Sequence, residues 1–283
     1  MIYSALLQCS IVSADKTGGG IQLNHTEAVL AVSFGTSYPE TCEKTIGAVE
    51  QDLAAVFPEA PVYRAWTSGF IRKKLRERDG IVVPSPADAL EKLHAEGVRD
   101  VLVQPTFLLQ GIEFDELKET LLAFLPRFDR IRLGRPLLSE ARDLDSVTDA
   151  VGASFPQLGP EDALVLMGHG TKHGANQVYP RLAGLFQEHG YGNVLLGTVE
   201  ASPGLSDILE QLDKKKPRKV LLAPFLFVAG DHAVNDLAGS GSDSWKSAVV
   251  SRGYRTECLT KGLGEYPEIR RMYLEHAAEA VPL

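Results

Sequence analysis

Cysteine is scarce in this sequence. The three cysteines, Cys9, Cys42 and Cys258, lie far apart, are odd in number and form no CxxC motif. A disulfide framework uses paired cysteines, and a thiolate zinc site uses closely spaced ones. The sequence therefore indicates neither kind of site. It favours a reducing compartment, which makes the cytoplasm the expected location.

Long apolar runs and clusters of basic residues are missing as well. No stretch approaches the ~20 apolar residues that a membrane helix requires, so we expect no membrane span. Lys and Arg number 29 against 37 Asp and Glu, for a net charge of −8, and the basic residues are dispersed. Because phosphate backbones are bound by clustered cations, a nucleic-acid partner is not expected. The densest basic run, DKKKPRK at 213–219, is typical of a solvated helix end before a strand.

The N-terminal residues carry a weak hint of targeting. MIYSALLQCSIVSAD contains a short apolar segment that ends in a V-x-A pattern, as at a signal-peptide cleavage site, but no Lys or Arg precedes it. The periplasm is therefore the alternative location if residues 1–14 act as a signal. Residues 1–27, which include three consecutive glycines at 18–20, are predicted to form a flexible leader.

From Ala28 onward, short apolar runs alternate with helical patterns. Apolar residues recur at spacings of three and four at 45–57 and 86–97, which predicts helices there. This alternation is typical of βαβ units and a parallel sheet. The predicted strands are 28–34, 61–66, 98–107, 130–134, 163–168, 193–199, 218–227 and 254–259.

The first four runs align with the last four. AVLAVSFGT at 28–36 matches ALVLMGHGT at 163–171, and VLVQPTFLLQGIE at 101–113 matches VLLAPFLFVAGDH at 220–232 without a gap. A weaker match pairs 61–68 with 193–200. A repeat of this long period predicts an α/β fold of two pseudo-symmetric Rossmann-like lobes with a cleft between them. We expect lobes at 28–150 and 151–283, each with a four-stranded parallel sheet flanked by helices.

Polar residues follow three of the strands predicted in the second lobe. His169, Glu200 and His232 lie just beyond the runs that end near 168, 199 and 227. Ligands bind at the carboxyl edge of a parallel sheet, so these side chains are expected to converge there. Two imidazoles and a carboxylate suit a borderline divalent metal such as Co, Ni, Fe or Zn, with positions left for a substrate.

The aligned positions in the first lobe carry different residues. Phe34 takes the place of His169, Ser68 that of Glu200, and Glu113 that of His232. Glu113 is therefore expected to face the metal site from the first lobe.

Other interpretations of these motifs stay open. A histidine at a strand end can simply hydrogen-bond to a loop carbonyl. The turn around His169 could instead cradle a phosphate, although GxGxxxG is not the dinucleotide fingerprint. His173 is undecided between a loop residue and a ligand on the entry path, and His25, His94, His189 and His276 are expected to be solvated.

A set of motifs spread from about Ala28 to the end resembles the class II tetrapyrrole chelatases, and among them the CbiK-type sirohydrochlorin cobaltochelatases. The motifs are FGTS, GIEFDEL, MGHGT, GTVEASP, PFLFVAGDHAVNDLAG, DSWKS and KGLGEYPEIRRMYLEH. The resemblance implies the chelatase fold and ATP-independent insertion of Co²⁺ into sirohydrochlorin, on the anaerobic route to cobalamin. It also implies that His169, Glu200 and His232 bind the metal and that Glu113 lines the cleft.

The same resemblance sets the expected cofactors. Co²⁺ and sirohydrochlorin are substrates, and no tightly bound cofactor is implied. Members that carry haem have a histidine just after the EF of GIEFDEL, where this chain has Asp115, so no haem is expected.

Metal insertion gives the candidate residues distinct tasks. The ion must shed water and replace two pyrrole protons, so His169, His232 and Glu113 are the candidate catalytic groups. The substrate is a polycarboxylate, and Arg64, Lys172 and the backbone N–H groups after Gly168 are candidate donors to it.

Other functions stay open. They are a sirohydrochlorin ferrochelatase, a nickel chelatase, and a non-catalytic two-lobed protein that binds metal or tetrapyrrole. A homo-oligomer is also left open.

Overall fold

The computed structural model describes residues 26–283. The predicted signal and nearly all of the predicted leader lie outside the described residues. Among the residues that are described, no helix combines the length and the apolar character needed to cross a membrane.

The chain divides into two compact units. The first contains the described residues up to Leu137 together with Arg270–Leu283, and the second is Leu138–Ile269. The sequence predicts a boundary at 150/151 and a second lobe that runs to the C-terminus. The last residues belong to the first unit because β9 (Val281–Pro282) pairs antiparallel with β4 (Arg130–Leu133). In addition, Ala277 of α11 (Pro267–Ala278) packs into a core cluster on the first sheet.

The first unit is built on a five-stranded sheet in the order β2-β1-β3-β4-β9. Its first four strands are parallel, and β9 is an antiparallel addition of two residues that the sequence prediction of four strands missed. The elements not yet given are β1 (Glu27–Ser33), α2 (Pro39–Cys42), η1 (Glu43–Gly47), α3 (Ala48–Val56), β2 (Val62–Trp66), α4 (Gly69–Asp79), α5 (Pro86–Ala95), β3 (Asp100–Pro105), α6 (Ile112–Phe124) and η2 (Leu125–Arg127).

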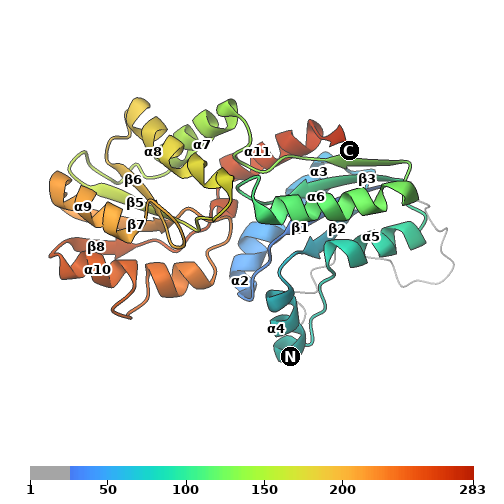
Figure 1. Cartoon of the computed structure of the whole chain (residues 1–283), viewed down its shortest axis with the longest axis horizontal. Helices are drawn as coiled ribbons and strands as arrows, with labels where there is room; N and C mark the ends of the chain where they lie inside the picture. Colours follow the sequence, from blue (N-terminus) through green and yellow to red (C-terminus); the bar gives the residue numbers. More distant parts are fainter. Residues whose placement is uncertain (1–25) are drawn as a thin grey trace. The chain divides into compact units, whose positions relative to one another are not determined.

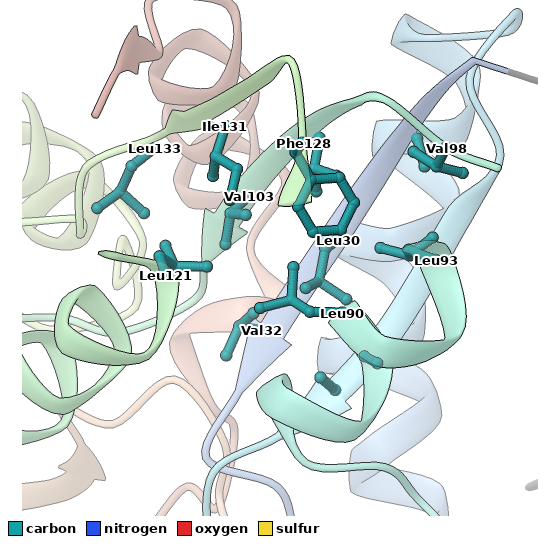
Figure 2. Packing of buried hydrophobic residues seen from close by; sticks show 14 of the residues in the cluster. Leu30, Val32, Leu90, Leu93, Val98, Val103, Leu121, Phe128, Ile131 and Leu133 are labelled. Atoms are coloured by element: carbon teal, nitrogen blue, oxygen red, sulfur yellow. The ribbon is translucent and has the colours of Figure 1, made fainter. Parts of the chain in front are cut away.

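Alternate residues of the central strands point to opposite faces of this sheet, as the two-residue period of a strand requires. Leu30 and Val103 lie in the cluster that α5 and α6 cover, whereas Val29 and Leu102 lie in the cluster on the α3 and α11 side (Figure 1). Figure 2 shows how the first cluster is filled. Both faces of the sheet are therefore buried, which explains why the strands appear in the sequence as continuous apolar runs.

The cap of α5 illustrates how local sequence sets an element boundary. The Ser85 hydroxyl accepts a hydrogen bond from the Asp88 N–H at 3.1 Å, and the Asp88 carboxylate accepts one from the Ser85 N–H at 3.0 Å. Pro86 occupies the first helical position, where its missing N–H is not needed. Such a capping box satisfies two backbone donors and begins the helix at this residue.

The second unit is built on a four-stranded parallel sheet in the order β6-β5-β7-β8. Figure 1 shows α7 and α8 along one face of it and α9 and α10 along the other. Its elements are α7 (Ala141–Ala153), β5 (Ala163–Gly168), η3 (Gly174–Gln177), α8 (Val178–Glu188), β6 (Val194–Thr198), α9 (Leu205–Lys215), β7 (Lys219–Pro224), η4 (Ala233–Leu237), α10 (Trp245–Ser251), β8 (Arg255–Cys258) and η5 (Leu263–Glu265).

The strand register confirms the internal duplication. Ala28 pairs with Val101 in the first sheet, and the residues aligned with them, Ala163 and Val220, pair in the second. The weaker match agrees too, since the pair Val29–Val62 corresponds to Leu164–Val194. All eight predicted strands are present, and the basic run at 213–219 forms the end of α9 and the start of β7.

Candidate metal centre

The structure brings His169, Glu200 and His232 together at the carboxyl edge of the second sheet. His169 directly follows β5, Glu200 lies two residues after β6, and His232 lies in the segment after β7. One potential ligand atom from each residue lies within 4.8 Å of the others. The His169 Nε2 is 3.8 Å from the Glu200 Oε1, and the two imidazole rings meet edge-on with centroids 4.8 Å apart.

Two glycines allow the chain to present His169. A side chain at Gly168 would place its Cβ 2.4 Å from a ring carbon of Tyr179. Gly170 has a φ of +82°, and a Cβ there would lie 2.8 Å from the Thr198 Cβ. The first position therefore needs a residue without a side chain for space, and the second for both space and backbone conformation.

Two N–H groups of this turn are already engaged. The Gly170 N–H donates to the Tyr179 hydroxyl at 3.4 Å, and the Thr171 N–H donates to the Asn176 Oδ1 at 3.0 Å. These donors are therefore directed into the protein rather than toward a ligand. The arrangement argues against the phosphate-cradle interpretation and against these N–H groups as donors to a substrate carboxylate.

Backbone hydrogen bonds connect the His169 turn to the segment that carries Glu200. The Glu200 N–H donates to the His169 carbonyl at 2.9 Å. The Asn176 side chain, which accepts from the first turn, also donates to the Ser202 carbonyl at 2.8 Å. The separation of His169 and Glu200 is thus set by main-chain contacts and by one bridging amide.

Both histidines use Nδ1 for a hydrogen bond to an acceptor. The Nδ1 of His169 lies 2.9 Å from the Gly170 carbonyl, and that of His232 lies 2.6 Å from the Asp236 Oδ2. Since a carbonyl oxygen and a carboxylate accept hydrogen bonds, each Nδ1 carries a proton, and in the neutral form of each imidazole the Nε2 has the lone pair. Two Nε2 atoms and a carboxylate oxygen are a suitable ligand set for a borderline divalent cation. Sequence reasoning missed Asp236, although its i,i+4 spacing from His232 was a usable signal.

The equivalent positions of the first unit have no such cluster. Phe34 follows β1 and is 49% exposed. Ser68 caps α4, where its hydroxyl accepts from the Ile71 N–H at 3.3 Å. Glu113 is exposed in the first turn of α6, and so is Asp115. The three-residue cluster does not include Glu113.

His173 is engaged within its own loop. Its Nδ1 accepts a hydrogen bond from the Ala175 N–H at 3.1 Å and so caps η3. It is not a member of the cluster formed by His169, Glu200 and His232.

The structure bears on two expectations about polar side chains. Arg64 makes two hydrogen bonds to the fully buried Glu50, so part of its donor capacity is used within the protein. Burial raises the pKa of the Glu50 carboxyl, and the Arg64 guanidinium opposes that rise. His276 was expected to be solvated, but it is 2% exposed and its Nδ1 lies 3.1 Å from the Arg135 carbonyl. Lys172 is exposed.

Comparison with known proteins now assigns the family. A family model described as Cobalt chelatase (CbiK) matches residues 27–282. The chain belongs to this family.

Two relatives and one solved structure show the extent of the similarity. The chain is 39% identical over 255 residues to the sirohydrochlorin cobaltochelatase of Salmonella typhimurium, a match that covers 90% of this chain and 96% of that protein. It is 31% identical to the sirohydrochlorin cobaltochelatase CbiKC of Nitratidesulfovibrio vulgaris, with 90% of each chain covered. The structure of SirB from Bacillus subtilis with Fe³⁺ superimposes with a TM-score of 0.62 at 16% identity, over 90% of this chain and 95% of that one. The last comparison shows that the fold is shared.

Proposed function

We propose that this protein is a sirohydrochlorin cobaltochelatase, a lyase that inserts Co²⁺ into sirohydrochlorin without ATP, on the anaerobic route to cobalamin. The observation that carries the proposal is the convergence of His169, Glu200 and His232 with both Nε2 atoms available. Two relatives that match nearly the whole chain carry the name of this activity.

The ligand types suit a metal that is a substrate. Neutral imidazole and carboxylate bind a borderline divalent ion and leave coordination positions open, so the ion can lose water and pass to pyrrole nitrogens. All three side chains are partly exposed to solvent. Accessibility supports exchange of the ion, whereas structural metal sites are usually closed.

Glu113 is proposed as the base that accepts the two pyrrole protons one at a time and releases each to solvent, to which its side chain is exposed. It is an exposed carboxylate at the carboxyl edge of the first sheet, at the position aligned with His232. A carboxylate at such an edge is a common general base.

The metal site is tested by mutation of each histidine. His169→Ala and His232→Ala should each lower the insertion rate at least ~10²-fold, because a positioned ligand or acid–base group is lost. Insertion is followed spectrally with sirohydrochlorin and with Co²⁺, Fe²⁺ or Ni²⁺ offered separately, so the preferred metal is read from the same assay. His189→Ala is the matched control, since His189 bonds to Asp149 on α7. Near-wild-type turnover of both site variants would refute the assignment.

Glu113→Gln separates proton transfer from binding. Glutamine keeps the shape of the side chain but cannot accept a proton at neutral pH. The variant should bind Co²⁺ and sirohydrochlorin within a few-fold of wild type, while insertion slows by ~10²–10⁴. Stopped-flow kinetics and equilibrium titrations measure the two effects. A collapse of Co²⁺ affinity would make Glu113 a ligand, and an unchanged rate would remove it from the mechanism.

The remaining features are proposed on narrower grounds. A cytoplasmic location is supported by Cys42 and Cys258, which are free thiols. We also propose that the protein has no resident haem. Family members that carry haem have a histidine at the helix position where this chain has Asp115. Size-exclusion chromatography with light scattering would decide whether the protein forms a homo-oligomer.

A further inference from the structure

We infer that Asp236 is a positioning residue that fixes the tautomer and the orientation of His232 and makes it the firmer of the two imidazole ligands. The inference rests on the proposed function, since it assumes that the His232 Nε2 binds the metal. It goes beyond that function because Asp236 itself is not a member of the ligand cluster.

The local fold aims the Asp236 carboxylate at the imidazole. His232 immediately precedes the π-helical turn η4, and Asp236 lies four residues later within it. Ala233 and Leu237 are fully buried, so the turn packs against the core of the second unit through these two side chains. His232 directly precedes Ala233, and Asp236 directly precedes Leu237. The side chains of His232 and Asp236 therefore lie on the same, partly exposed face of the turn. There the Asp236 Oδ2 lies 2.6 Å from the His232 Nδ1.

The neighbouring polar side chains have other partners. The Asn235 amide donates to the Asp231 Oδ1 at 3.1 Å. The His169 imidazole meets the His232 ring edge-on, and its own Nδ1 is directed to the Gly170 carbonyl. Asp236 is therefore the group with a hydrogen bond to the His232 Nδ1.

The two imidazoles are held by acceptors of different charge. Gly170 offers His169 a neutral carbonyl, whereas Asp236 offers His232 a carboxylate. A carboxylate behind a ligating histidine orients the ring and increases its strength as a donor to the metal. His232 should thus retain the ion while His169 releases it first. Release from His169 before His232 suits a metal ion that is transferred to a substrate rather than retained by the protein.

The test compares three substitutions of Asp236. Asp236→Ala removes the acceptor, and Asp236→Asn keeps the shape but lets an amide N–H donate to Nδ1, which favours the wrong tautomer. Asp236→Glu restores a carboxylate on a longer arm. Glu210→Gln, on an exposed position of α9, is the control for loss of one negative charge. The probe is Co²⁺ alone, titrated into the full-length protein.

A tautomer-fixing role predicts an unusual order of effects. Asp236→Asn should weaken Co²⁺ binding at least as much as Asp236→Ala, both by about 10–100-fold, and Asp236→Glu should recover part of the loss. A purely structural role predicts the reverse, since asparagine is the closest isostere. Long-range ¹H–¹⁵N spectra of the metal-free protein, at about pH 8 where a free imidazole is neutral, should show the proton of His232 on Nδ1 in wild type and on Nε2 in Asp236→Asn.

The outcomes separate this inference from the proposed function. Wild-type Co²⁺ affinity in Asp236→Asn, or a proton on Nε2 in the wild-type protein, would overturn the role of Asp236 while His232→Ala still abolished binding. Unchanged Co²⁺ affinity in His232→Ala would instead remove the metal site, and the inference with it.

Discussion

Substitution of Gly170 by alanine tests whether the turn after β5 is as constrained as its geometry indicates. The φ of +82° places this residue in the left-handed region, which costs a non-glycine residue about 1–2 kcal/mol. The new Cβ would lie 2.8 Å from the Thr198 Cβ and 2.9 Å from the Ala201 Cβ. Overpacking of this kind costs about 1–3 kcal/mol. The variant should therefore lose roughly 2–5 kcal/mol of unfolding free energy.

The loss should be visible in stability and in function. At about 4 °C per kcal/mol for a domain of this size, the Tm should fall by roughly 8–20 °C. Relief of the overlap would displace Ala201 and with it the neighbouring Glu200, so insertion by the folded fraction should fall about 10²-fold. Calorimetry and the spectral insertion assay measure both effects.

Gly174→Ala is a matched control in the same loop. A Cβ at Gly174 meets no atom within 4 Å, so this variant should stay within about 0.5 kcal/mol of wild type. Equal stability and equal activity of the two alanine variants would refute the argument that the turn requires glycine.

Two further predictions concern the scaffold. Glu50→Ala should destabilise the protein by about 3–5 kcal/mol in urea unfolding, because it leaves the largely buried Arg64 guanidinium without its carboxylate; a loss below 1 kcal/mol would contradict this. The hydrogen bond to Asp149 raises the pKa of His189, so the folded state holds that proton more tightly than the unfolded state, whose histidine pKa is about 6.5. This stabilisation should be complete below about pH 6.5 and lost as the pH rises through the folded pKa. The urea midpoint should therefore fall less between pH 6 and about pH 8.5 in His189→Gln than in wild type, and equal slopes would exclude the effect.

The strands and their register could be predicted from sequence because both faces of each central strand are buried. Continuous apolar runs mark such strands. The ungapped match of 101–113 with 220–232 fixes which residues of the two sheets correspond. The ends of the strands were predicted less accurately. The run at 98–107 extends beyond β3, which ends at Pro105, because Thr106 is buried past the sheet and Phe107 packs against the core.

Features that depend on contacts distant in sequence were missed. β9 has only two residues, too few for a periodic pattern, and it exists because it pairs with β4. His276 lies in a polar stretch of sequence, but the return of α11 to the first unit buries it. Asp236 does not follow a strand directly, and its position depends on a turn of helix beyond β7, so the strand-end pattern that predicts the ligands does not include it.

The shared register separates what the fold supplies from what the side chains supply. Each unit provides three backbone positions at the carboxyl edge of its sheet, yet only the second fills all three with ligand atoms. In the first unit Phe34 has no polar atom in its side chain, and the Ser68 hydroxyl is engaged in capping α4. Glu113 is then the one carboxylate of that set, and a single carboxylate holds a divalent ion poorly. Such a group can still accept a proton, so divergence after duplication accounts for the metal site proposed in one unit and for the base proposed in the other.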